Sequence, residues 1–570
     1  IMPITNNFYN KIINNLRTIK KNFYLYDDKK ISYADLFQKI KKINFYLRDL
    51  EKKKIGLYCD KSEFYYSAVI AIILSGNTWV QIPKGNPEER NKYIVEESKV
   101  ELIFQDQNID YIKNIRKINF QQIQKNTNGK DFENNTPFKA NDIASIFFTS
   151  GSTGEPKGVK ITYQNMISCL IYQLTNLKYS KNDIFSDFHD SSFVMSLVTI
   201  LPCIYVGGSI VPFYKNTDQI VASEIIKKNK ISVLITVPSF MMLLNNQIKK
   251  KINIEKIILC GENFSLNIFK IVKNKFNFKK LFNCYGATEL SPWAFYYKYQ
   301  SKDEKDFNKM GQVPIGKPFK GLLIKKNKFK ELLISGNVVS DGYTEKKLDN
   351  QKFIIIRKRR FYNTGDLFTI YKNQYYILGR NDKQIKIRGY RVNLLEIDTN
   401  LRKLEGINYC FSFFKKNSIS TIYSSNSLIT EKKLENFLRQ GLPSYMIPKK
   451  FYYIKKLKFN KNGKIDRNFM LICGFEKFDK FFVRIDILER LFLKIIDNEK
   501  EIKLVAEMLN LLGCSKESFV KLINKMGYKT FDKNNETFFK YLPKRGKNAN
   551  VPSRKNKDNP FSILSEINFK

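Results

Sequence analysis

Short apolar strands and helical stretches alternate along the first half of the chain, and this alternation is the strongest constraint on its fold. "KIGLYC" and "VELIF" flank the helical stretch "EFYYSAVIAIIL", and further along "ISVLITV" and "EKIILC" flank a second helical segment. Strand, helix and strand in this order indicate parallel βαβ units. We therefore predict an α/β fold that begins with a large, layered N-terminal domain.

The pattern changes near residue 380, where the polar segment "GRNDK" precedes shorter strands and helices. A chain of 570 residues also exceeds what one hydrophobic core ordinarily holds. We predict a large α/β domain over residues 1–380, a small, hinged α+β domain over 381–467, and a helical extension over 468–570. The basic end of this extension, "YLPKRGKNANVPSRKNKDNP", has the composition of a disordered segment.

The formal net charge of +45 would ordinarily suggest a polyanionic partner. The lysines, however, are spread from Lys11 to Lys570 among abundant Asn, Ile, Phe and Tyr, as in chains from AT-rich genomes. Charge alone therefore assigns no function, and nucleic acid is not the expected partner. A non-catalytic nucleic-acid-binding protein that uses the basic tail remains the alternative from another class.

Cysteine usage and hydropathy bear on location. The eight cysteines never fall in C-x-x-C spacing and the only histidine is His189, which disfavours zinc sites and a disulfide framework and favours a reducing cytoplasm. Residues 191–214 carry no charge and are long enough to cross a bilayer. Pro202 and Gly207 divide them into a helix-sized and a strand-sized piece, so we predict a buried core element and no membrane span.

A glycine-rich loop follows the buried strand "DIASIFFT". In "FFTSGSTGEPKGVKIT", residues 147–162, the glycines allow close approach of a ligand to the backbone, and the hydroxyls and N–H groups supply hydrogen-bond donors. Lys157 adds a positive charge, and the spacing differs from that of a Walker loop. The sequence therefore predicts a phosphate-binding loop.

This loop resembles the phosphate loop of the adenylate-forming, AMP-binding superfamily. Other motifs of that family follow in its order, and the last two look most like amino-acid-activating domains of nonribosomal peptide synthesis and D-alanine–carrier-protein ligases. They are "NCYGATE" at 283–289, "YNTGDL" at 362–367, "GRNDKQIKIRGYRVNLLEID" at 379–398 and "NKNGKIDR" at 460–467.

The resemblance implies an AMP-forming acid–thiol ligase that uses ATP and Mg²⁺. A carboxylic acid attacks the α-phosphate of ATP to give an acyl adenylate and pyrophosphate, and a thiol then displaces AMP. The chain has no "G-x-D-S-L"-like carrier segment. The expected thiol therefore belongs to a phosphopantetheine carrier protein acting in trans, and the alternative acceptor is coenzyme A, as in an acyl- or aryl-CoA ligase.

The resemblance also implies roles for the residues that match its motifs. Asn283 and Tyr285 would bind adenine, Asp366 the ribose, and Arg380 the ribose or a phosphate. The loop residues that would hold the β- and γ-phosphates are Thr149, Ser150, Gly151, Ser152, Thr153, Gly154 and Lys157.

The reacting centre is assigned in the same way. The resemblance places Thr288 at the α-phosphate, makes Glu289 the magnesium ligand, and makes Lys464 the catalytic lysine that bridges the substrate carboxylate and the α-phosphate. Asp382 matches the hinge about which the small domain rotates between the two steps, and Gly389 would line the pantetheine channel.

The chain departs from the amino-acid-activating pattern at one position. Counting back from Gly207 and Pro202, the family's "F-D-x-S" segment is "FVMS" here, so that Val194 stands where an aspartate pairs with the α-ammonium group of the substrate. An ammonium group without an ion pair in a desolvated pocket is costly. Either the acid lacks an α-amino group, which we favour, or nearby Asp190 takes over the pairing. The expected pocket residues are Asp190, Val194, Met195, Val198, Thr236, Ile258, Cys260, Cys284, Pro292 and Trp293.

Overall fold

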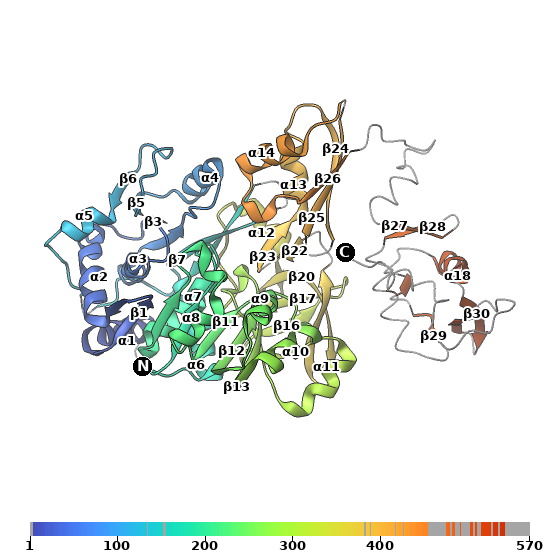
Figure 1. Ribbon diagram of the computed structural model, residues 1–570, viewed down its shortest axis with the longest axis horizontal. Helices are drawn as coiled ribbons and strands as arrows, with labels where there is room; N and C mark the ends of the chain where they lie inside the picture. The colour runs from blue at the N-terminus through green and yellow to red at the C-terminus, as the bar shows by residue number, and fades with distance from the viewer. Residues whose placement is uncertain are drawn as a thin grey trace. The chain divides into compact units, whose positions relative to one another are not determined.

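The computed structural model describes most of the chain up to residue 453 and short segments beyond it (Figure 1). The described residues are 4–133, 135–151, 155–380, 384–387, 389–415, 418–425, 427–453, 475–478, 481–484, 491, 502–505, 508–509, 515–525, 528–533 and 536–541.

Two large sheets form the body of the protein. The nine-stranded sheet has the order β15-β14-β13-β12-β11-β9-β10-β1-β2, and the seven-stranded sheet has the order β18-β8-β7-β4-β3-β5-β6. Neighbours from β1 to β13 in the first sheet and from β7 to β6 in the second are parallel, as the βαβ pattern predicts. In the first sheet the strands are β1 (Asn22–Tyr26), β2 (Lys29–Ser32), β9 (Ile184–Asp187), β10 (Ser209–Pro212), β11 (Val233–Thr236), β12 (Ile252–Cys260), β13 (Phe276–Tyr285), β14 (Phe295–Lys298) and β15 (Lys317–Pro318), and in the second β3 (Lys54–Tyr58), β4 (Thr78–Gln81), β5 (Leu102–Gln105), β6 (Arg116–Asn119), β7 (Ile143–Thr149), β8 (Lys157–Thr162) and β18 (Gly342–Tyr343).

Helices cover the faces of both sheets. One buried hydrophobic core contains residues of six helices together with residues of both sheets, and a second core joins four further helices to β11, β12 and β13. Figure 1 shows α8, α9 and α10 beside these three strands. The first group is α1 (Ile4–Thr18), α2 (Tyr33–Leu47), α3 (Glu63–Leu74), α5 (Phe120–Lys125), α6 (Tyr163–Leu177) and α7 (Met195–Val206), and the second is α8 (Ala222–Lys228), α9 (Pro238–Gln247), α10 (Leu266–Lys275) and α11 (Glu304–Met310). Helix α4 (Glu88–Ser98) packs in a third core on the seven-stranded sheet.

Local sequence explains where these helices begin and end. The Ser32 side chain accepts a hydrogen bond from the Asp35 N–H at the start of α2, and Thr162 and Asn165 form a capping box on α6. Gly207 adopts φ +77° and ends α7, which allows β10 to begin two residues later. The uncharged segment 191–214 is therefore one buried helix and one buried strand, as predicted.

A third, five-stranded sheet completes the large body and leads into the C-terminal elements. Its strands are β16 (Leu323–Lys326), β17 (Glu331–Ser335), β19 (Phe353–Ile356), β20 (Arg359–Tyr371) and β21 (Gln374–Arg380), with the short helix α12 (Asp349–Lys352) before β19. Smaller elements follow: the hairpin β22 (Gln384–Ile387) and β23 (Tyr390–Asn393), helix α13 (Leu394–Leu401), strands β24 (Ile407–Lys415), β25 (Ser418–Ser425) and β26 (Lys450–Tyr453), and helix α14 (Glu431–Gly441).

By contacts, the chain divides into two compact units. The first holds residues 1–405, 410–421 and 429–451, and the second holds 406–409, 422–428 and 452–570. The hairpin β22–β23 and α13 thus belong to the first unit. The domain boundaries expected at residues 380 and 467 stay a prediction.

Beyond residue 468 the structure describes only short segments, so the predicted helical extension stays a prediction. The described segments include helix α18 (Lys516–Lys525) and several strands: β27 (Phe475–Phe478) pairs with β28 (Phe481–Arg484), and β29 (Ile502–Lys503), β31 (Glu536–Tyr541) and β30 (Tyr528–Lys533) form a sheet. Consecutive residues of β30 pair with consecutive residues of β31 in an antiparallel hairpin that the sequence pattern did not predict.

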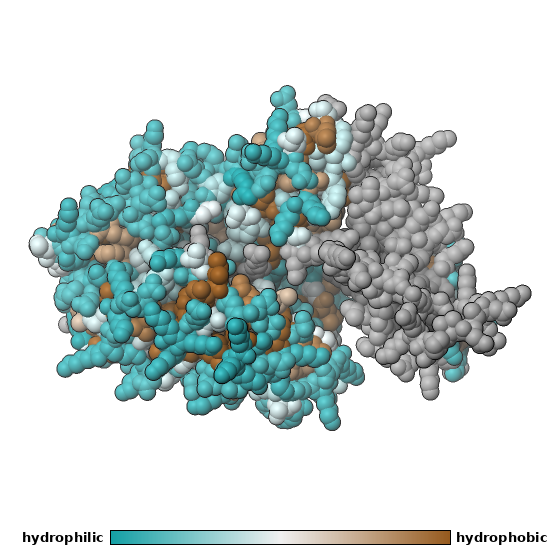
Figure 2. All heavy atoms as spheres, viewed as in Figure 1, coloured by the Kyte–Doolittle hydropathy of each residue, from teal (hydrophilic) through white to brown (hydrophobic). Residues whose placement is uncertain are grey.

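On the face shown in Figure 2, hydrophilic residues cover most of the described surface, and hydrophobic residues appear only in small groups. No helix in the described part of the chain is both long enough and apolar enough to cross a bilayer.

Candidate active site

The glycine-rich loop connects β7 to β8. Thr149 ends β7 and Lys157 begins β8, and a Cβ atom on Gly151 would lie 1.9 Å from the Glu155 carbonyl oxygen, so that only glycine fits. Ser150 is buried, and its Oγ donates a hydrogen bond to the Arg391 carbonyl oxygen at 2.6 Å. Ser152, Thr153 and Gly154 lie outside the described residues.

Lys157 is buried at the start of β8, with 7% of its surface exposed. Burial lowers the pKa of its ammonium group, and the carboxylate of Glu289 opposes this shift. Its Nζ lies 5.6 Å from the centroid of the Tyr343 ring. The loop therefore presents a desolvated positive charge near a buried carboxylate.

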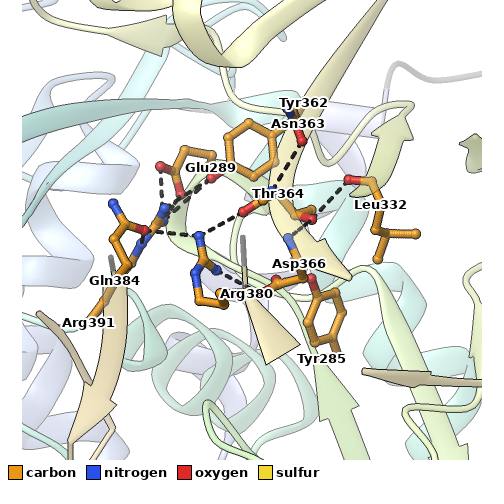
Figure 3. A network of polar contacts seen from close by, with 11 residues as sticks. Tyr285, Glu289, Leu332, Tyr362, Asn363, Thr364, Asp366, Arg380, Gln384 and Arg391 are labelled. Carbon is orange, nitrogen blue, oxygen red and sulfur yellow. Dashed lines mark hydrogen bonds and ion pairs between the residues drawn. The ribbon is translucent and has the colours of Figure 1, made fainter. Parts of the chain in front are cut away.

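Glu289 is the carboxylate of this region and lies in a single 3₁₀ turn, Thr288–Leu290. Arg391 Nη1 donates to its two oxygens at 2.9 and 3.1 Å (Figure 3). The Tyr343 hydroxyl donates to Glu289 Oε1 at 2.7 Å. Burial favours the neutral acid, but Arg391 and Tyr343 outweigh it and lower the pKa of Glu289. Glu289 is therefore an anion at neutral pH.

The residues expected at the ribose and adenine form a second network. Asp366 on β20 accepts hydrogen bonds from the Tyr285 hydroxyl and, at 2.8 Å, from Arg380 Nη1. Arg380 Nη2 also donates to Gln384 Oε1 at 3.0 Å, and Arg391 Nε donates to the same oxygen at 2.6 Å. Figure 3 shows Gln384 between the two arginines, so that one polar network connects Asp366 to Glu289.

Asn283 lies beside this network at the end of β13 and is 2% exposed. Its Nδ2 donates to the carbonyl oxygen of Pro314 at 2.9 Å. The side-chain oxygen of Asn283 is thereby oriented and can accept a hydrogen bond from an amino group such as that of adenine.

The expected acid pocket lies where neighbouring strands end. Thr236 ends β11 and Cys260 ends β12, and Cys284 pairs in register with Cys260 on β13. Ligands of parallel sheets bind at these carboxyl ends. Most of the predicted residues join one buried hydrophobic core: Val194, Met195, Val198, Ile258, Cys260, Cys284 and Trp293.

Two of these residues bring their sulfur atoms close together. Cys260 Sγ lies 3.7 Å from Met195 Sδ, and burial raises the pKa of the Cys260 thiol. Pro292 is buried and follows a cis peptide bond. The surroundings of Val194 are therefore apolar, and the side chain itself is 6% exposed.

Asp190 does not join these residues. Its side chain is exposed, Oδ1 accepts hydrogen bonds from the N–H and hydroxyl of Ser192 at 2.9 and 2.7 Å, and Oδ2 lies 3.3 Å from the Tyr390 hydroxyl. The carboxylate thus caps its own loop and contacts the hairpin β22–β23.

A buried polar cluster lies where β9 ends, close to the start of α3. Lys61 Nζ donates to Asp187 Oδ1 at 2.7 Å and to the carbonyl oxygen of His189, and the Tyr66 hydroxyl donates to Asp187 Oδ2 at 2.7 Å. His189 Nε2 lies 3.1 Å from Thr199 Oγ1 on α7. Burial lowers the pKa of His189 to about 4, so the imidazole is neutral at pH 7.

The hairpin β22–β23 packs closely on the large body. The Gly389 N–H donates to Glu262 Oε1 at 2.6 Å, and a Cβ atom at Gly389 would lie 2.7 Å from Val237 Cγ1. Lys386 Nζ lies 5.8 Å from the Tyr285 ring centroid, and burial lowers its pKa. The segment after the polar hinge therefore contributes directly to the site.

Arg391 and Gln384 thus connect the glycine-rich loop and Glu289 to Arg380 and Asp366, most of the expected pocket residues join one hydrophobic core, and Asp190 is exposed. Asp382 and Lys464 lie outside the described residues. Arg391 and Glu396 lie within the motif at 379–398, but the sequence predicted no role for them. Tyr343 and Glu262 were not predicted as site residues. The spacing of "GYRVNLLEID", with its charges two and seven residues after Gly389, was the available signal for the first two.

A magnesium ion requires oxygen ligands, and one or two carboxylates with substrate phosphates and water are enough. Glu289 meets this requirement as a buried anion close to the phosphate loop, provided that Arg391 moves from its oxygens. Among the residues that the structure describes, no cluster of three or more His, Cys, Asp or Glu is placed to hold a metal by itself. Any magnesium bound here would therefore depend on phosphate ligands.

Comparisons of sequence with known proteins agree with this site. The family described as AMP-binding enzyme matches residues 14–344. The D-alanine–D-alanyl carrier protein ligase of Staphylococcus haemolyticus is 29% identical over 467 residues, which cover 77% of this chain and 93% of that protein. The ligase of the same name from Staphylococcus aureus strain Newman is 28% identical over 465 residues, again 77% of this chain and 93% of that protein.

Comparison with solved structures concerns the fold. The adenylation domain AlmE of Vibrio cholerae, in complex with glycyl-adenosine-5'-phosphate, has a TM-score of 0.71 at 18% identity and covers 83% of this chain and 98% of that chain. The o-succinylbenzoate CoA synthetase of Bacillus subtilis has a TM-score of 0.70 at 18% identity, covering 80% and 97%. The predicted fold class, layered N-terminal sheets with small C-terminal α+β sheets, is confirmed.

Proposed function

The chain belongs to the AMP-binding enzyme family, whose members are AMP-forming, carboxylate-adenylating ligases, and from this premise we propose that it activates a small carboxylic acid without an α-ammonium group and transfers the acyl group to a carrier-protein thiol. One oxygen of the acid attacks the α-phosphorus of ATP and pyrophosphate leaves. The thiol sulfur then attacks the acyl carbon, AMP leaves, and the thiol proton passes to solvent or a base.

The arrangement of charges supports this chemistry. Two anionic reactants repel one another, so the site has to supply positive charge and fixed geometry. Lys157 brings a buried ammonium group to the phosphate loop, and we assign the loop residues 149–153 to the β- and γ-phosphates. Thr288 is assigned to the α-phosphate, and Lys464 to the bridge between acid and phosphate.

We assign the adenosine part of ATP to the residues around Asp366. We assign the ribose hydroxyls to Asp366, whose carboxylate Tyr285 and Arg380 already orient, and the adenine amino group to Asn283. Glu289 would hold Mg²⁺ together with phosphate oxygens. When bound, this ion neutralises phosphate charge and favours the departure of pyrophosphate.

The apolar surroundings of Val194 are the observation that supports an acid without an α-ammonium group. It lies in an apolar cluster at the start of α7, and the carboxylate nearest in sequence, Asp190, is exposed and engaged with Ser192 and Tyr390. An α-ammonium group placed against Val194 would lose its hydration without gaining a counter-ion. A keto, hydroxy, aryl or short acyl acid avoids this cost.

The relatives' name, D-alanine–D-alanyl carrier protein ligase, supports a carrier protein as acceptor. Coenzyme A is the second candidate, because the fold is shared with a CoA synthetase. Thioester formation with a phosphopantetheine-loaded carrier protein and with free coenzyme A, compared at equal thiol concentration, distinguishes the two acceptors. A cytoplasmic location remains a prediction from cysteine usage.

Carboxylate-dependent ATP–pyrophosphate exchange tests the proposal. We expect exchange with acids that lack an α-amino group, its loss in Lys464→Ala, and a shift towards amino acids in Val194→Asp. Glu435→Gln, which breaks only an exposed ion pair on α14, serves as the control for folding. Exchange by the unchanged chain only with α-amino acids would contradict the assignment of Val194, and silence across the panel would contradict the proposed function.

A further inference from the structure

A basic groove lies at the amino ends of β11, β12 and β13, opposite the carboxyl ends where the expected acid pocket lies. The groove is open to solvent, has a volume of about 1030 Å³, and lies between the end of α8 and the end of α10. Strand β12 alone extends over nine residues at about 3.3 Å each, so about 26 Å separates Ile252 in the groove from Cys260 at the pocket. The groove is therefore a surface that the proposed reaction does not use.

Lysines supply most of the charge of this groove. They come from every element that borders it: the last turn of α8, the loop before β11, the turn before β12, the last turn of α10, and β13. Each of these lysines is exposed, so the lining is strongly positive. Among the described residues that line the groove, the charged ones are Lys227, Lys230, Lys251, Lys273, Lys279 and a single acid, Glu255.

Carboxylates neutralise only part of this charge. Lys279 Nζ lies 2.8 Å from Glu255 Oε1, and Lys273 Nζ lies 2.7 Å from Glu304 Oε1 on α11. Within the part of the chain that the structure describes, no carboxylate forms an ion pair with the other three lysines of the groove. Like charges on a concave wall repel one another and attract an anion, because the surrounding protein has a low dielectric constant and focuses their field.

The size and shape of the groove favour a polymer as its ligand. Small molecules fill pockets of about 300–1,000 Å³ that enclose most of their surface. This groove, at about 1030 Å³, reaches the upper end of that range and is open. A bilayer surface is flat on this scale and would meet the rim of the groove, not its lining. We therefore expect an anionic chain that follows the groove.

The aromatic residues of the lining favour a polypeptide over a nucleic acid. Single strands of nucleic acid bind proteins largely by stacking their bases on accessible aromatic rings. Phe276 is 2% exposed, and Phe278 is half-buried and packs edge to face with Tyr299, with ring centroids 5.9 Å apart. Asn253 and Asn277 are exposed instead, and their amide groups can donate hydrogen bonds to carboxylates. Lysine and asparagine side chains together suit a chain of Asp and Glu residues.

We propose that the basic groove binds an acidic segment of a partner protein, in which several Asp or Glu residues follow one another closely. This inference goes beyond the proposed function and does not depend on it, because the groove and the acid pocket lie at opposite ends of the same strands. A partner bound in the groove would tether the enzyme and leave the carboxyl ends of these strands accessible.

Binding of a fluorescein-labelled oligoglutamate peptide to the full chain tests the inference. Fluorescence anisotropy should show binding that weakens as salt is added, because ions at 0.15 M screen exposed charges beyond about 8 Å. The triple variant Lys227→Gln, Lys230→Gln, Lys251→Gln should bind the peptide about tenfold more weakly, since each exposed charge pair contributes a factor of about two.

A second triple variant is the matched control. Lys113→Gln, Lys125→Gln, Lys139→Gln removes the same charge from exposed lysines outside the groove. It should bind the peptide within about twofold of the unchanged chain. Equal loss of binding in both triple variants would overturn the groove as the binding site, because the total charge of the chain would then decide the affinity.

Two further probes test the choice of partner. An oligouridylate, and vesicles of phosphatidylcholine with phosphatidylglycerol, are titrated under the same conditions. We expect both to depend less on the groove than oligoglutamate does, with a smaller difference between the two triple variants. If the oligouridylate or the vesicles bind more tightly than the peptide and lose binding only in the groove variant, a nucleic acid or a membrane replaces the polypeptide and the inference is overturned.

Discussion

Two buried ion pairs in the large body have the same chemistry and different surroundings. Lys61 and Asp187 lie 2.7 Å apart at the end of β9, and Arg391 and Glu289 lie 2.9 Å apart at the 3₁₀ turn Thr288–Leu290. The first pair joins the loop before α3 to the end of β9, and Tyr66 completes its hydrogen bonds. Every partner of that pair is a fixed part of the core.

The second pair joins the core to the hairpin that follows the expected hinge. Glu289 also has a competing partner, because the proposed function brings a metal and phosphates to it. The comparison teaches that burial alone does not make an ion pair permanent. A buried pair is permanent where no other ligand can replace a partner, and exchangeable where one can.

The largest expected effect comes from breaking the permanent pair. Lys61→Met leaves the fully buried Asp187 without its cation, which should lower the free energy of unfolding by about 3–5 kcal/mol. Urea unfolding followed by tryptophan fluorescence measures this change. The double variant Lys61→Met, Asp187→Leu should recover part of the loss, and a single-variant loss below about 1 kcal/mol would show that the pair is not a fixed part of the core.

Acid should weaken the same cluster through His189. Burial lowers its pKa from 6.5 to about 4, Asp187 opposes the shift, and Lys61 adds to it. Because the unfolded chain binds the proton more readily, stability should fall as the pH drops from 6.5 towards 4, by about 3 kcal/mol in total.

Since the chain has one histidine, its imidazole NMR signal can be followed without ambiguity. Titration near pH 4 is expected, together with loss of the pH dependence between pH 6.5 and 4 in His189→Asn. A midpoint near 6.5 would mean that solvent reaches the cluster.

The exchangeable pair should respond to ligand where the permanent pair does not. In Arg391→Met, which frees Glu289 for the metal, Mg–pyrophosphate should bind about tenfold more tightly and so raise the free energy of unfolding by about 1.4 kcal/mol more than in the unchanged chain. Lys61→Met should gain no more than the unchanged chain. Equal gains in all three forms would remove the distinction between the two pairs.

The smallest effect is expected at the surface. Arg439 and Glu435 form an exposed pair one turn apart on α14, with 50% and 41% of their side chains accessible. Arg439→Met should change stability by no more than about 0.5 kcal/mol, since water screens such pairs. A larger loss, measured by urea unfolding, would show that charge pairs matter here irrespective of burial.

Much of the fold was predictable because local patterns determine local structure. "EFYYSAVIAIIL" is α3, residue for residue, and "DIASIFFT" contains β7. Gly207 ends α7 because its positive φ favours glycine. The strands after residue 468 were not predicted, because short amphipathic segments fit a helix or a hairpin equally well and only pairing decides between them.

The sequence by itself determined which chemical groups the site contains: a glycine loop with Lys157, the carboxylates Glu289 and Asp366, and an apolar residue at Val194. Motif spacing carries this information because each group serves a local backbone conformation or a single contact. Only the tertiary structure decided the partners. Arg391 lies 102 residues from Glu289, and Glu396 lies 245 residues from Gly151. Contacts across such separations depend on how the sheets and the hairpin pack, and the packing brought Asp190 to Tyr390, Arg391 to Glu289, and Glu396 to the glycine-rich loop.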